Sequence, residues 1–331
     1  MDVRTPSIPT RRLPKVVVIG GGTGLSVMLR GLKEKPLDLT AIVTVADDGG
    51  SSGVLRQELH IPPPGDIRNV LMALANVEPL LSRLLRYRFP AGSGLAGHSL
   101  GNLMLAAMTD IAGDFVSGVR ELSQVLAVRG RVLPAAAQGT VLKAVMEDGS
   151  VVVGESQIPK ARGKIRRVMI EPEGVEPLPE AVEAIREADC ILIGPGSLYT
   201  SIMPNLLVKG LAEAIIASDA LKLFVCNVMT QPGETDGYTV SDHLDAIEAH
   251  VGAPLFHAVI VNNGEIPPDV LAKYAEEGAS VVVCDEEKLA ARGIRVIADH
   301  LVKVQTYLRH DAAKLSDHIE RLVQEWISGK R

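Results

Sequence analysis

The run from Lys15 to Gly24 restricts the fold of this chain more than any other stretch. It begins with four consecutive apolar β-formers, Val16 to Ile19, and passes into a turn that is almost entirely glycine. An unbroken apolar run of this length is typical of a strand buried on both faces, as in a parallel sheet. Glycine allows a sharp turn with positive φ and a close approach of another group to the backbone.

A helix is predicted directly after this turn, from Leu25 to Leu32. If it starts at Thr23 or Gly24, its free N–H groups and the positive end of its dipole face the turn. The stretch therefore predicts a site for an anion, most naturally a phosphate. A tight strand-to-helix turn without a ligand is the alternative. The candidate binding residues of this first glycine loop are Gly21, Gly22, Thr23, Gly24 and Leu25.

The first glycine loop does not match the dinucleotide fingerprint G-x-G-x-x-G. Counted from Gly20, the last glycine position is occupied by Leu25, and counted from Gly22 it is occupied by Val27. The loop therefore indicates a nucleotide or a phosphate without indicating NAD.

The composition favours an α/β protein with a large aliphatic core. Of 331 residues, 47% are hydrophobic, 22% are charged and only 3% are aromatic. A core built from Val, Leu, Ile and Ala favours buried parallel strands covered by helices. The net charge of -6 argues against a nucleic-acid-binding protein, which should present a basic face.

Several features predict a cytoplasmic protein. No apolar stretch reaches the roughly 20 residues needed to span a bilayer. Residues 1–14 are expected to form a flexible N-terminal tail and lack the apolar core of an export signal. Cys190, Cys226 and Cys284 are not paired at metal-ligand or redox spacing and lie beside apolar strands, which predicts buried, reduced thiols.

Two adjacent acids follow the second predicted strand, Leu39–Val45. In a doubly wound sheet this tip lies beside the first glycine loop, at the carboxyl edge where ligands bind. Asp47 or Asp48 can take a ribose hydroxyl or hold Mg²⁺ beside a phosphate, and Ser51 and Ser52 can hold phosphate oxygens. The alternative is a helix N-cap with a solvated turn, where Asp, Ser and Gly are common.

Two further polar groups precede predicted helices. Asp66 follows a proline run and is expected to cap a helix, while Asn69, in the first turn, can also point at an anion. His98 stands beside Ser99 in a glycine-framed turn and is predicted to contact a ligand. A serine-hydrolase interpretation is disfavoured, because adjacent residues rarely place an imidazole on the neighbouring hydroxyl and the G-x-S-x-G motif is missed by one position.

A second glycine loop follows the predicted strand Asp189–Ile193 and leads into a predicted helix, Leu206–Ile216. The anion-binding argument applies again. Two such loops at separate strand ends suit a pyrophosphate, or a nucleotide that faces a second phosphorylated group. The candidate residues of this second glycine loop are Gly194, Pro195, Gly196, Ser197, Thr200 and Ser201.

Amide-rich tips end two more predicted strands, Leu221–Cys226 and Phe256–Val261. Asn and Gln carry both a donor and an acceptor, so they can recognise the edge of a base or a sugar. Further along, a strand is expected at Ser280–Cys284 and an amphipathic helix at Asp311–Trp326. Arg309 can bind a phosphate or pair with Asp311. The candidates from these segments are Asn227, Thr230, Gln231, Glu234, Asn262, Asn263 and Arg309.

A β-hairpin is predicted where Asp148-Gly149 separates the β-rich runs Val141–Met146 and Val151–Gly154. A basic run from Lys160 to Arg167 follows and is expected to be a solvated face or to frame an acidic ligand. No linker divides the chain, so a single α/β domain is expected over residues 15–331, with the hairpin as an embellishment around 140–170.

Taken together, these motifs resemble the CofD-like family, and within it the YvcK branch, the gluconeogenesis factors of bacteria. The resemblance covers about residues 15 to 328. It rests on the segments at 18–25, 47–53, 63–69, 97–102 (which ends in Asn102), 194–201, 227–235 and 261–264.

The resemblance implies a Rossmann-like, three-layer α/β/α sandwich that binds nucleotides, with UDP-sugars expected in this branch. It also implies a cytoplasmic protein required for cell shape and cell-wall growth under gluconeogenic conditions. The sister branch is 2-phospho-L-lactate transferase, a Mg²⁺-dependent enzyme, and Asp47 and Asp48 occupy its metal motif. Some relatives carry a phosphorylatable Thr where this chain has Ala312, so regulation by phosphorylation is left open.

Two functions therefore stay open. The first is a UDP-sugar-binding regulatory factor without turnover, which requires no cofactor. The second is a Mg²⁺-dependent transferase of the 2-phospho-L-lactate type. With either function, the protein is expected to form a homo-oligomer, namely a dimer. UDP-sugar, GDP and NAD stay open as nucleotides, although an NAD-dependent dehydrogenase is disfavoured by the failed fingerprint.

Overall fold

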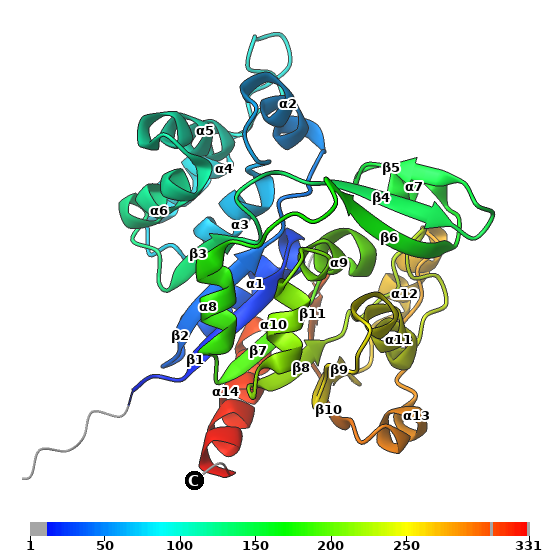
Figure 1. Ribbon diagram of the computed structural model, residues 1–331. Coiled ribbons are helices and arrows are strands. Elements are labelled where there is room, and N and C mark those ends of the chain that lie inside the picture. Colours follow the sequence, from blue (N-terminus) through cyan, green and yellow to red (C-terminus); the bar gives the residue numbers. More distant parts are fainter. Residues whose placement is uncertain (1–11, 305–306, 330–331) are drawn as a thin grey trace, which may run out of the picture.

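The computed structural model describes residues 12–304 and 307–329 (Figure 1). Its centre is a seven-stranded sheet with the order β10-β9-β8-β7-β1-β2-β3, in which every neighbouring pair is parallel. Helices flank this sheet, which confirms the predicted α/β class. The strands are β1 (Lys15–Gly20), β2 (Asp38–Val43), β3 (Arg131–Pro134), β7 (Cys190–Ile193), β8 (Leu221–Val225), β9 (Ala258–Asn262) and β10 (Arg295–Asp299).

The strand order reverses between β1 and β7. From β1 the chain continues through β2 to β3, and after β7 it continues in the opposite direction through β8 and β9 to β10. Val16 of β1 lies opposite Leu39 of β2 on one side and opposite Cys190 of β7 on the other. In open parallel sheets, ligands bind outside the carboxyl ends of the strands at such a reversal. Both predicted glycine loops leave the sheet at this point.

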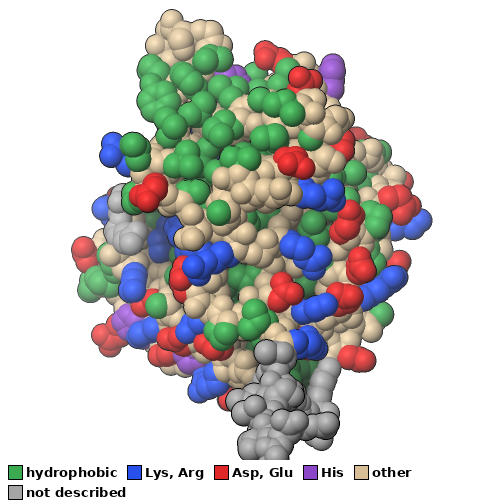
Figure 2. Space-filling view, turned by 90° about the vertical axis from the view of Figure 1, so that its left-hand side faces the viewer, with side chains coloured by type: hydrophobic (Ala, Val, Ile, Leu, Met, Phe, Trp, Pro, Cys, Tyr) green, Lys and Arg blue, Asp and Glu red, His purple; other side chains and the backbone are tan. Residues whose placement is uncertain are grey.

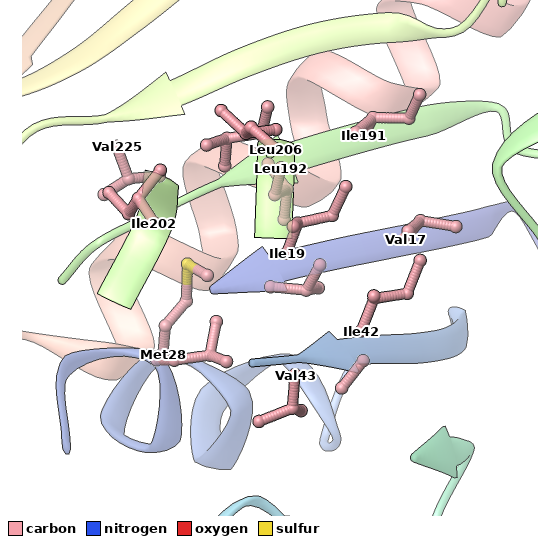
Figure 3. Close-up of a cluster of buried hydrophobic side chains, with 14 of the residues drawn as sticks. Val17, Ile19, Met28, Ile42, Val43, Ile191, Leu192, Ile202, Leu206 and Val225 are labelled. Carbon is pink, nitrogen blue, oxygen red and sulfur yellow. The ribbon is translucent and has the colours of Figure 1, made fainter. Parts of the chain in front are cut away.

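The core between these strands is aliphatic, as the composition predicts. Val17 and Ile19 of β1 lie against Ile42 of β2 and Ile191 and Leu192 of β7, all of them buried (Figure 3). Full burial of an aliphatic side chain of this size contributes roughly 1.5–3 kcal/mol. The unbroken apolar run of β1 therefore stabilises the strand from which the first glycine loop emerges.

The helices pack in two groups. Helix α1 contacts α3 and α14, whereas α8 contacts α10 (Figure 1). The helices are α1 (Gly22–Leu32), α2 (Gly50–Leu59), α3 (Gly65–Leu74), α4 (Pro79–Arg86), α5 (Leu100–Ala112), α6 (Phe115–Val125), α7 (Ile158–Ala161), α8 (Pro179–Arg186), α9 (Met203–Leu206), α10 (Leu211–Ala217), α11 (Val240–Val251), α12 (Pro268–Glu276), α13 (Glu286–Ala291), α14 (Ala312–Gly329) and the π-helix η1 (Leu198–Ile202).

A three-stranded antiparallel sheet interrupts the alternation of strands and helices. The predicted hairpin forms β4 (Val141–Met146) and β5 (Val151–Val153), and β6 (Ile165–Glu171) pairs with the other edge of β4. The basic run was not expected to contribute a strand, but its last residues form the start of β6. In Figure 1 this sheet lies to the upper right of the central sheet.

Two expected elements differ in the structure. The helix expected at Leu206–Ile216 is divided, because α9 ends at Leu206 and α10 begins only after Gly210, whose φ is 85°. The strand expected at Ser280–Cys284 is wrong. That segment makes only isolated bridges, from Val281 to Met229 and from Val283 to Thr239. A two-stranded sheet, β11 (Val302–Val304) with β12 (Leu308–His310), precedes α14.

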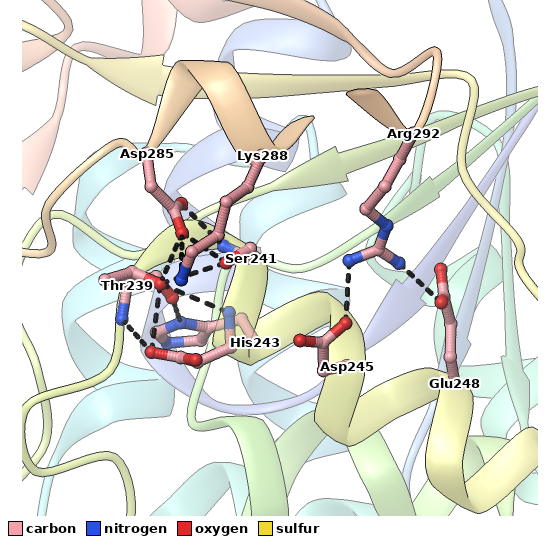
Figure 4. A network of polar contacts seen from close by, with 9 residues as sticks. Thr239, Ser241, His243, Asp245, Glu248, Asp285, Lys288 and Arg292 are labelled. Carbon is pink, nitrogen blue, oxygen red and sulfur yellow. Dashed lines mark hydrogen bonds and ion pairs between the residues drawn. The ribbon is translucent and has the colours of Figure 1, made fainter. Parts of the chain in front are cut away.

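Side-chain hydrogen bonds join α11 to α13 (Figure 4). Thr239 and Asp242 form a reciprocal capping box at the start of α11. Asp285, directly before α13, accepts hydrogen bonds from Thr239 Oγ1 at 3.0 Å and from the Ser241 amide at 3.0 Å. Arg292 pairs with two acidic side chains of α11. These contacts fix the segment that follows the tip of β8.

The N-terminal tail, the three cysteines and the absence of a membrane span were also predicted from the sequence. Residues 1–11 of the expected tail lie outside the described residues, while Arg12 forms an ion pair with Asp189 at 2.8 Å. Cys190, Cys226 and Cys284 are free thiols, and Cys284 is only half-buried. Within residues 12–304 and 307–329, no single helix is both long enough and apolar enough to cross a membrane.

Candidate functional site

A cleft of about 320 Å³ lies where both glycine loops leave the sheet. Because β1 and β7 are parallel neighbours, their carboxyl ends place the two loops side by side. The loops nearly touch: a Cβ on Gly24 would lie 3.1 Å from the carbonyl oxygen of Pro195, and one on Gly22 would lie 3.4 Å from Ser201 Oγ. The two loops therefore form one continuous wall.

The other walls come from the β8 tip, from α12 with the residues after it, and from β12. The lining residues that the sequence singled out are Gly21, Gly22, Thr23, Gly24, Pro195, Gly196, Ser197, Ser201, Asn227, Thr230, Gln231 and Arg309. The remaining lining residues are Val27, Val228, Met229, Pro232, Tyr274, Glu277, Ala279, Leu308 and His310. Those on α12 and β12 were missed, because no glycine or amide motif marks these segments.

The start of α1 presents backbone groups to this cleft. Helix α1 begins at Gly22, one or two residues earlier than expected, and no side chain of its N-cap residue, Gly21, satisfies its first amides. Asp66 reaches across from α3 and accepts a hydrogen bond from the Gly22 amide. Thr23 and Gly24 carry the next amides of the first turn and both line the cleft. An anion in the cleft would meet these donors.

Asn227, at the tip of β8, shapes the second glycine loop. Its Nδ2 donates to the Gly196 carbonyl oxygen at 2.7 Å, and its Oδ1 accepts from the Gly196 amide at 3.1 Å. From its residue type, this amide was expected to orient a base or a sugar. In the structure both of its polar atoms are engaged with the loop, so Asn227 acts on a ligand through the loop backbone.

Glu234 and Thr200 lie behind the cleft and not in its lining. Glu234 accepts hydrogen bonds from Thr200 Oγ1 at 2.9 Å, from Gln231 Nε2 at 2.6 Å and from the Tyr199 amide at 3.1 Å. Burial raises the pKa of Glu234 to about 7, even though these bonds favour the ionised form. The network holds η1 against the β8 tip and places Gln231 at the cleft.

Arg309 of β12 brings a positive charge to the first glycine loop. Its Nη1 donates to Thr23 Oγ1 at 3.1 Å. The expected alternative, an ion pair with Asp311, is not formed, because Asp311 pairs with Lys303 at 3.1 Å. Ala312, the position raised for phosphorylation, starts α14 and packs against Gly31.

The acids at the β2 tip form a separate group, in which Asp66 is buried and Asp47 and Asp48 are half-buried. Asp47 Oδ1 accepts from the Gly49 amide at 2.9 Å, and Asp48 Oδ1 accepts from the Ser156 amide at 2.8 Å. Asp66 is not the cap of its own helix, because Pro64 takes that position and Asp66 lies within the first turn. Burial and then the charge of Asp47 raise the pKa of Asp66 to about 6.

Glu155 completes this group and was missed by the sequence analysis. It follows β5, where the sequence signals only a hairpin. Burial and then the charges of Asp66 and Asp47 raise its pKa well above the ordinary value. Glu234 also contributes to this effect. We call Asp47, Asp66, Glu155 and Glu234 the acid cluster.

The expected magnesium site was tested on these side chains. In the described part of the chain, no three His, Cys, Asp or Glu side chains are placed to hold a metal ion together. Asp47 and Asp48 each accept a hydrogen bond from a backbone amide, and the charge of Asp47 acts on Asp66 from nearby. Mg²⁺ is often held by one or two carboxylates together with substrate phosphates and water. Asp47 and Asp66 fit that donor set better than the predicted pair, Asp47 with Asp48.

Ser51, His98 and Asn102 come together beside the acid cluster. Ser51 Oγ lies 3.0 Å from His98 Nδ1 and accepts a hydrogen bond from Asn102 Nδ2 at 3.0 Å. All three side chains are buried and none lines the cleft. The neighbouring Ser99 caps α5 instead. The imidazole thus contacts a serine 47 residues away, which its position in the sequence does not reveal.

Other predicted residues also lie outside the cleft. Asn262 bonds to the Gly264 backbone and accepts from the Leu301 amide at 2.9 Å, so it holds the turn after β9. The remaining predicted residues that do not line the cleft are Leu25, Ser52, Asn69 and Asn263, while Asp47, Asp48, Asp66, Thr200 and Glu234 lie beneath it or beside it.

Comparison with known proteins places this site in a family. A family model described as 2-phospho-L-lactate transferase CofD matches residues 16–302. The chain is 60% identical over 305 residues to a gluconeogenesis factor of Halalkalibacterium halodurans, covering 92% of this chain and 95% of that protein. It is 56% identical to the gluconeogenesis factor of Bacillus subtilis, covering 94% of this chain and 99% of that one.

The fold is also found in a solved structure. A crystal structure of a UPF0052 family member from Bacillus halodurans superposes with a TM-score of 0.91 at 58% identity, covering 94% of this chain and 99% of that one.

Proposed function

The chain belongs to the CofD family, and on that premise we propose that it is a gluconeogenesis factor. Its ligand in this proposal is a nucleotide sugar, namely a UDP-sugar, bound in the cleft between the two glycine loops. One observation carries the proposal: both loops and Arg309 line the same cleft at the strand-order reversal. Ligands of open α/β sheets bind at such a place, and the volume of about 320 Å³ lies in the range of small-molecule pockets.

The lining suits a diphosphate. The first-turn amides of Thr23 and Gly24 offer donors on one side, and Ser197 and Ser201 offer hydroxyls on the other. Arg309 adds a guanidinium, whose fork matches phosphate oxygens. Thr230 and Gln231, at the far side of the loops, are placed to bond to the base or the sugar.

The same lining supports binding without turnover. Burial lowers the pKa of His310, the histidine of the lining, to about 4, so it is neutral at physiological pH and a poor proton donor. The buried acids with raised pKa values lie outside the lining. The proposal therefore assigns the cleft to ligand sensing, and with it a role in cell shape and wall growth under gluconeogenic conditions, as the resemblance implies.

A second candidate function is a Mg²⁺-dependent transferase of the 2-phospho-L-lactate type, which the name of the matching family model supports. Asp47 and Asp66 would hold the metal, and Mg²⁺ bound there would neutralise charge on a transferring group. Buried polar atoms support a ligand at this place: Glu155 Oε2 and Thr44 Oγ1 have no hydrogen-bond partner in the described part of the chain. Asp66 would also keep accepting the hydrogen bond from the Gly22 amide, and this bond would orient the start of α1.

A cytoplasmic homodimer belongs to the same proposal. Free cysteines suit a reducing compartment. The dimer is supported by exposed apolar side chains on α4 and α5, among them Leu80, Leu84 and Ile111. Figure 2 shows hydrophobic side chains gathered in the upper half of this face. Sedimentation analysis that finds only a monomer at micromolar concentration would remove the dimer.

Titration calorimetry with UDP-N-acetylglucosamine tests the main proposal. We expect saturable binding to the unmodified protein and at least about a tenfold loss in Arg309→Ala, because a charged hydrogen-bond donor to phosphate is removed. Arg295→Ala is the matched control, since Arg295 is an exposed arginine of β10 that pairs with Glu325. The UDP-sugar assignment fails if this ligand gives no heat while GDP or NAD binds.

The transferase alternative has its own assay. Product formation from a diphosphonucleoside donor should require Mg²⁺ and should be lost in Asp47→Asn. Asp148→Asn, in the exposed hairpin turn, serves as the control. Turnover that persists in Asp47→Asn would exclude the assigned metal ligand.

A further inference from the structure

Asn205, a residue outside the predicted motifs, joins the two strand ends from which the glycine loops emerge. It belongs to α9, which follows η1, and its side chain is fully buried. Its Nδ2 donates to the Gly20 carbonyl oxygen at 3.2 Å and to the Ser201 carbonyl oxygen at 2.9 Å. Gly20 ends β1 directly before the first glycine loop, and Ser201 belongs to the second. Among the residues that the structure describes, no other side chain bonds to the backbone of both segments.

The amide of Asn205 is present in spite of a cost in stability. Because both neighbours are carbonyl oxygens, only its NH₂ group can face them. Its Oδ1 is left without a hydrogen-bond partner in the described part of the chain, and an unpaired buried acceptor is destabilising. Leucine has nearly the same volume and no polar atom, so burial alone would favour leucine here. Broken local rules of this kind are expected at functional sites, and the two donated hydrogen bonds explain the asparagine.

Asn205 also follows an uncommon backbone turn. The second glycine loop passes into η1, where the Ile202 amide donates to the Ser197 carbonyl oxygen at 3.0 Å. Such π-helical turns are rare and often occur at functional sites. Glu234 bonds to the start of this turn, and Asn205 bonds to its end at the Ser201 carbonyl oxygen. Of these two buried side chains, only Asn205 also bonds to β1.

The two glycine loops are packed closely at Ser201. A Cβ on Gly22 would lie 3.4 Å from Ser201 Oγ, and one on Gly196 would lie 3.4 Å from the Gly21 carbonyl oxygen. Ser201 and the first turn of α1 line the same cleft. A displacement of Ser201 by about 1 Å would therefore change which phosphate oxygens the two loops can reach together.

We propose that Asn205 is a positioning residue for the ligand of the cleft. By bonding to Gly20 and to Ser201, it sets the distance between the first-turn amides of α1 and the Ser201 hydroxyl, so that one diphosphate can contact both. The nature of the ligand rests on the proposed function, whereas the spacing of the loops is a property of the free protein. Asn205 does not line the cleft, so it acts on the ligand through the loops.

Asn205→Leu tests this role, because it removes the donor and keeps the volume. The Gly20 carbonyl oxygen retains the Thr44 amide as a donor at 3.1 Å, so we expect the variant to fold. Asn205→Ala, which adds no atom, carries the same expectations should the leucine variant misfold. Thr109→Val is the matched control. It also removes a buried side-chain donor to a carbonyl oxygen, that of Leu105 in α5, a helix without residues in the cleft lining.

Two readouts are combined. In crystals of the free proteins, the distance from the Gly22 amide nitrogen to Ser201 Cα should change by about 1 Å or more in Asn205→Leu and stay the same in Thr109→Val. In calorimetry, Asn205→Leu should bind UDP-N-acetylglucosamine at least about tenfold more weakly at full stoichiometry. Thr109→Val should bind it as the unmodified protein does. A residue that only stabilised the fold would lower the melting temperature or the number of competent molecules, and leave their affinity unchanged.

Unchanged loop spacing in Asn205→Leu overturns the positioning role, and so does unchanged affinity in spite of an altered spacing. An equal loss of affinity in Thr109→Val overturns it as well, since the effect would then be one of general destabilisation. If UDP-N-acetylglucosamine binds to none of the proteins, including the unmodified one, the proposed function fails, and the crystallographic comparison alone decides whether Asn205 sets the spacing of the loops.

Discussion

The cleft and the acid cluster lie next to each other but are built from opposite materials. The cleft is lined by glycine loops, hydroxyls, amides and Arg309, and it is open to ligand. The acid cluster consists of two buried carboxylates, Asp66 and Glu234, and two half-buried ones, Asp47 and Glu155. Burial raises the pKa values of Asp66, Glu155 and Glu234. Backbone amides bind phosphate at any physiological pH, whereas buried carboxylates change charge near neutrality. Ligand affinity and pH sensitivity are thus assigned to different parts of one edge of the sheet.

The two regions are joined at two points. The first is the hydrogen bond from Gln231 Nε2, in the lining of the cleft, to Glu234 at 2.6 Å, and the second, which we call the junction, is at Asp66. Asp66 accepts a hydrogen bond from the Gly22 amide, and a Cβ on Gly21 would lie 2.5 Å from Asp66 Oδ2. If the regions are otherwise independent, changes to acids of the cluster away from these two contacts should alter stability and its pH dependence without altering binding in the cleft. Changes at the junction should alter both.

The largest expected effect is the pH dependence that Glu234 confers on stability. Its pKa rises from the ordinary 4.5 to about 7 in the folded protein. The unfolded chain therefore loses this proton first, so the folded state loses stability as the pH rises from about 4.5 to 7 and no more above that range. A pKa difference of one between the folded and unfolded states corresponds to about 1.4 kcal/mol, so the folded state loses on the order of 3 kcal/mol of unfolding free energy over this range.

Urea unfolding between pH 4 and pH 8 measures this effect. The difference in unfolding free energy between Glu234→Gln and the unmodified protein should shift in favour of the variant as the pH rises through this window. Glu121→Gln, at an exposed position of α6, should give a difference that does not vary with pH. A pH-independent difference for Glu234→Gln would mean that folding does not change the pKa of Glu234, and the assignment of pH sensitivity to the acid cluster would lose its main support.

The next largest effect is expected at the junction. Gly21→Ala places a methyl group 2.5 Å from Asp66 Oδ2 and 2.7 Å from Thr44 Cγ2, so the side chains or the loop must shift. Overpacking of this kind costs about 1–3 kcal/mol, and the displaced loop should also bind UDP-N-acetylglucosamine more weakly. Gly94→Ala is the control, because a Cβ there meets no atom within 4 Å. Calorimetry and urea unfolding report the two effects. Unchanged values in both would show that the loop adapts and that the two regions are not coupled.

The sequence predicts the residues that line the cleft better than it predicts the acid cluster. Glycine turns after apolar strands are local signals, and the parallel order of β1 and β7 brings both loops together once the α/β class is known. Asn227 was found for the same reason, as it lies two residues beyond the end of β8. Its bonds to Gly196 depend on the loop conformation and were not predictable from residue type.

The acid cluster depends on contacts between segments that are distant in the sequence. Glu155 joins Asp66 because the three-stranded sheet folds back over the β2 tip, and no local pattern in a hairpin signals that approach. His98 meets Ser51 only through the packing of α5 against α2. The strand expected at Ser280–Cys284 shows the converse case. Its β-forming residues lie outside the central sheet, so local propensity did not decide its structure.

The smallest expected effect tests whether the buried serine beside the acid cluster takes part in ligand binding. Ser51→Ala removes the acceptor for Asn102 Nδ2 and the partner of His98 Nδ1 in a buried place. The loss should be about 1 kcal/mol of unfolding free energy, as for a single buried hydrogen-bonding group. Ser123→Ala is the control, since its hydroxyl bonds only to the Val119 carbonyl oxygen within α6. Because Ser51 does not line the cleft, UDP-N-acetylglucosamine affinity should be the same in both variants. A selective loss of affinity in Ser51→Ala would show that the buried serine and histidine act on the ligand, and the division between binding and titratable regions would have to be abandoned.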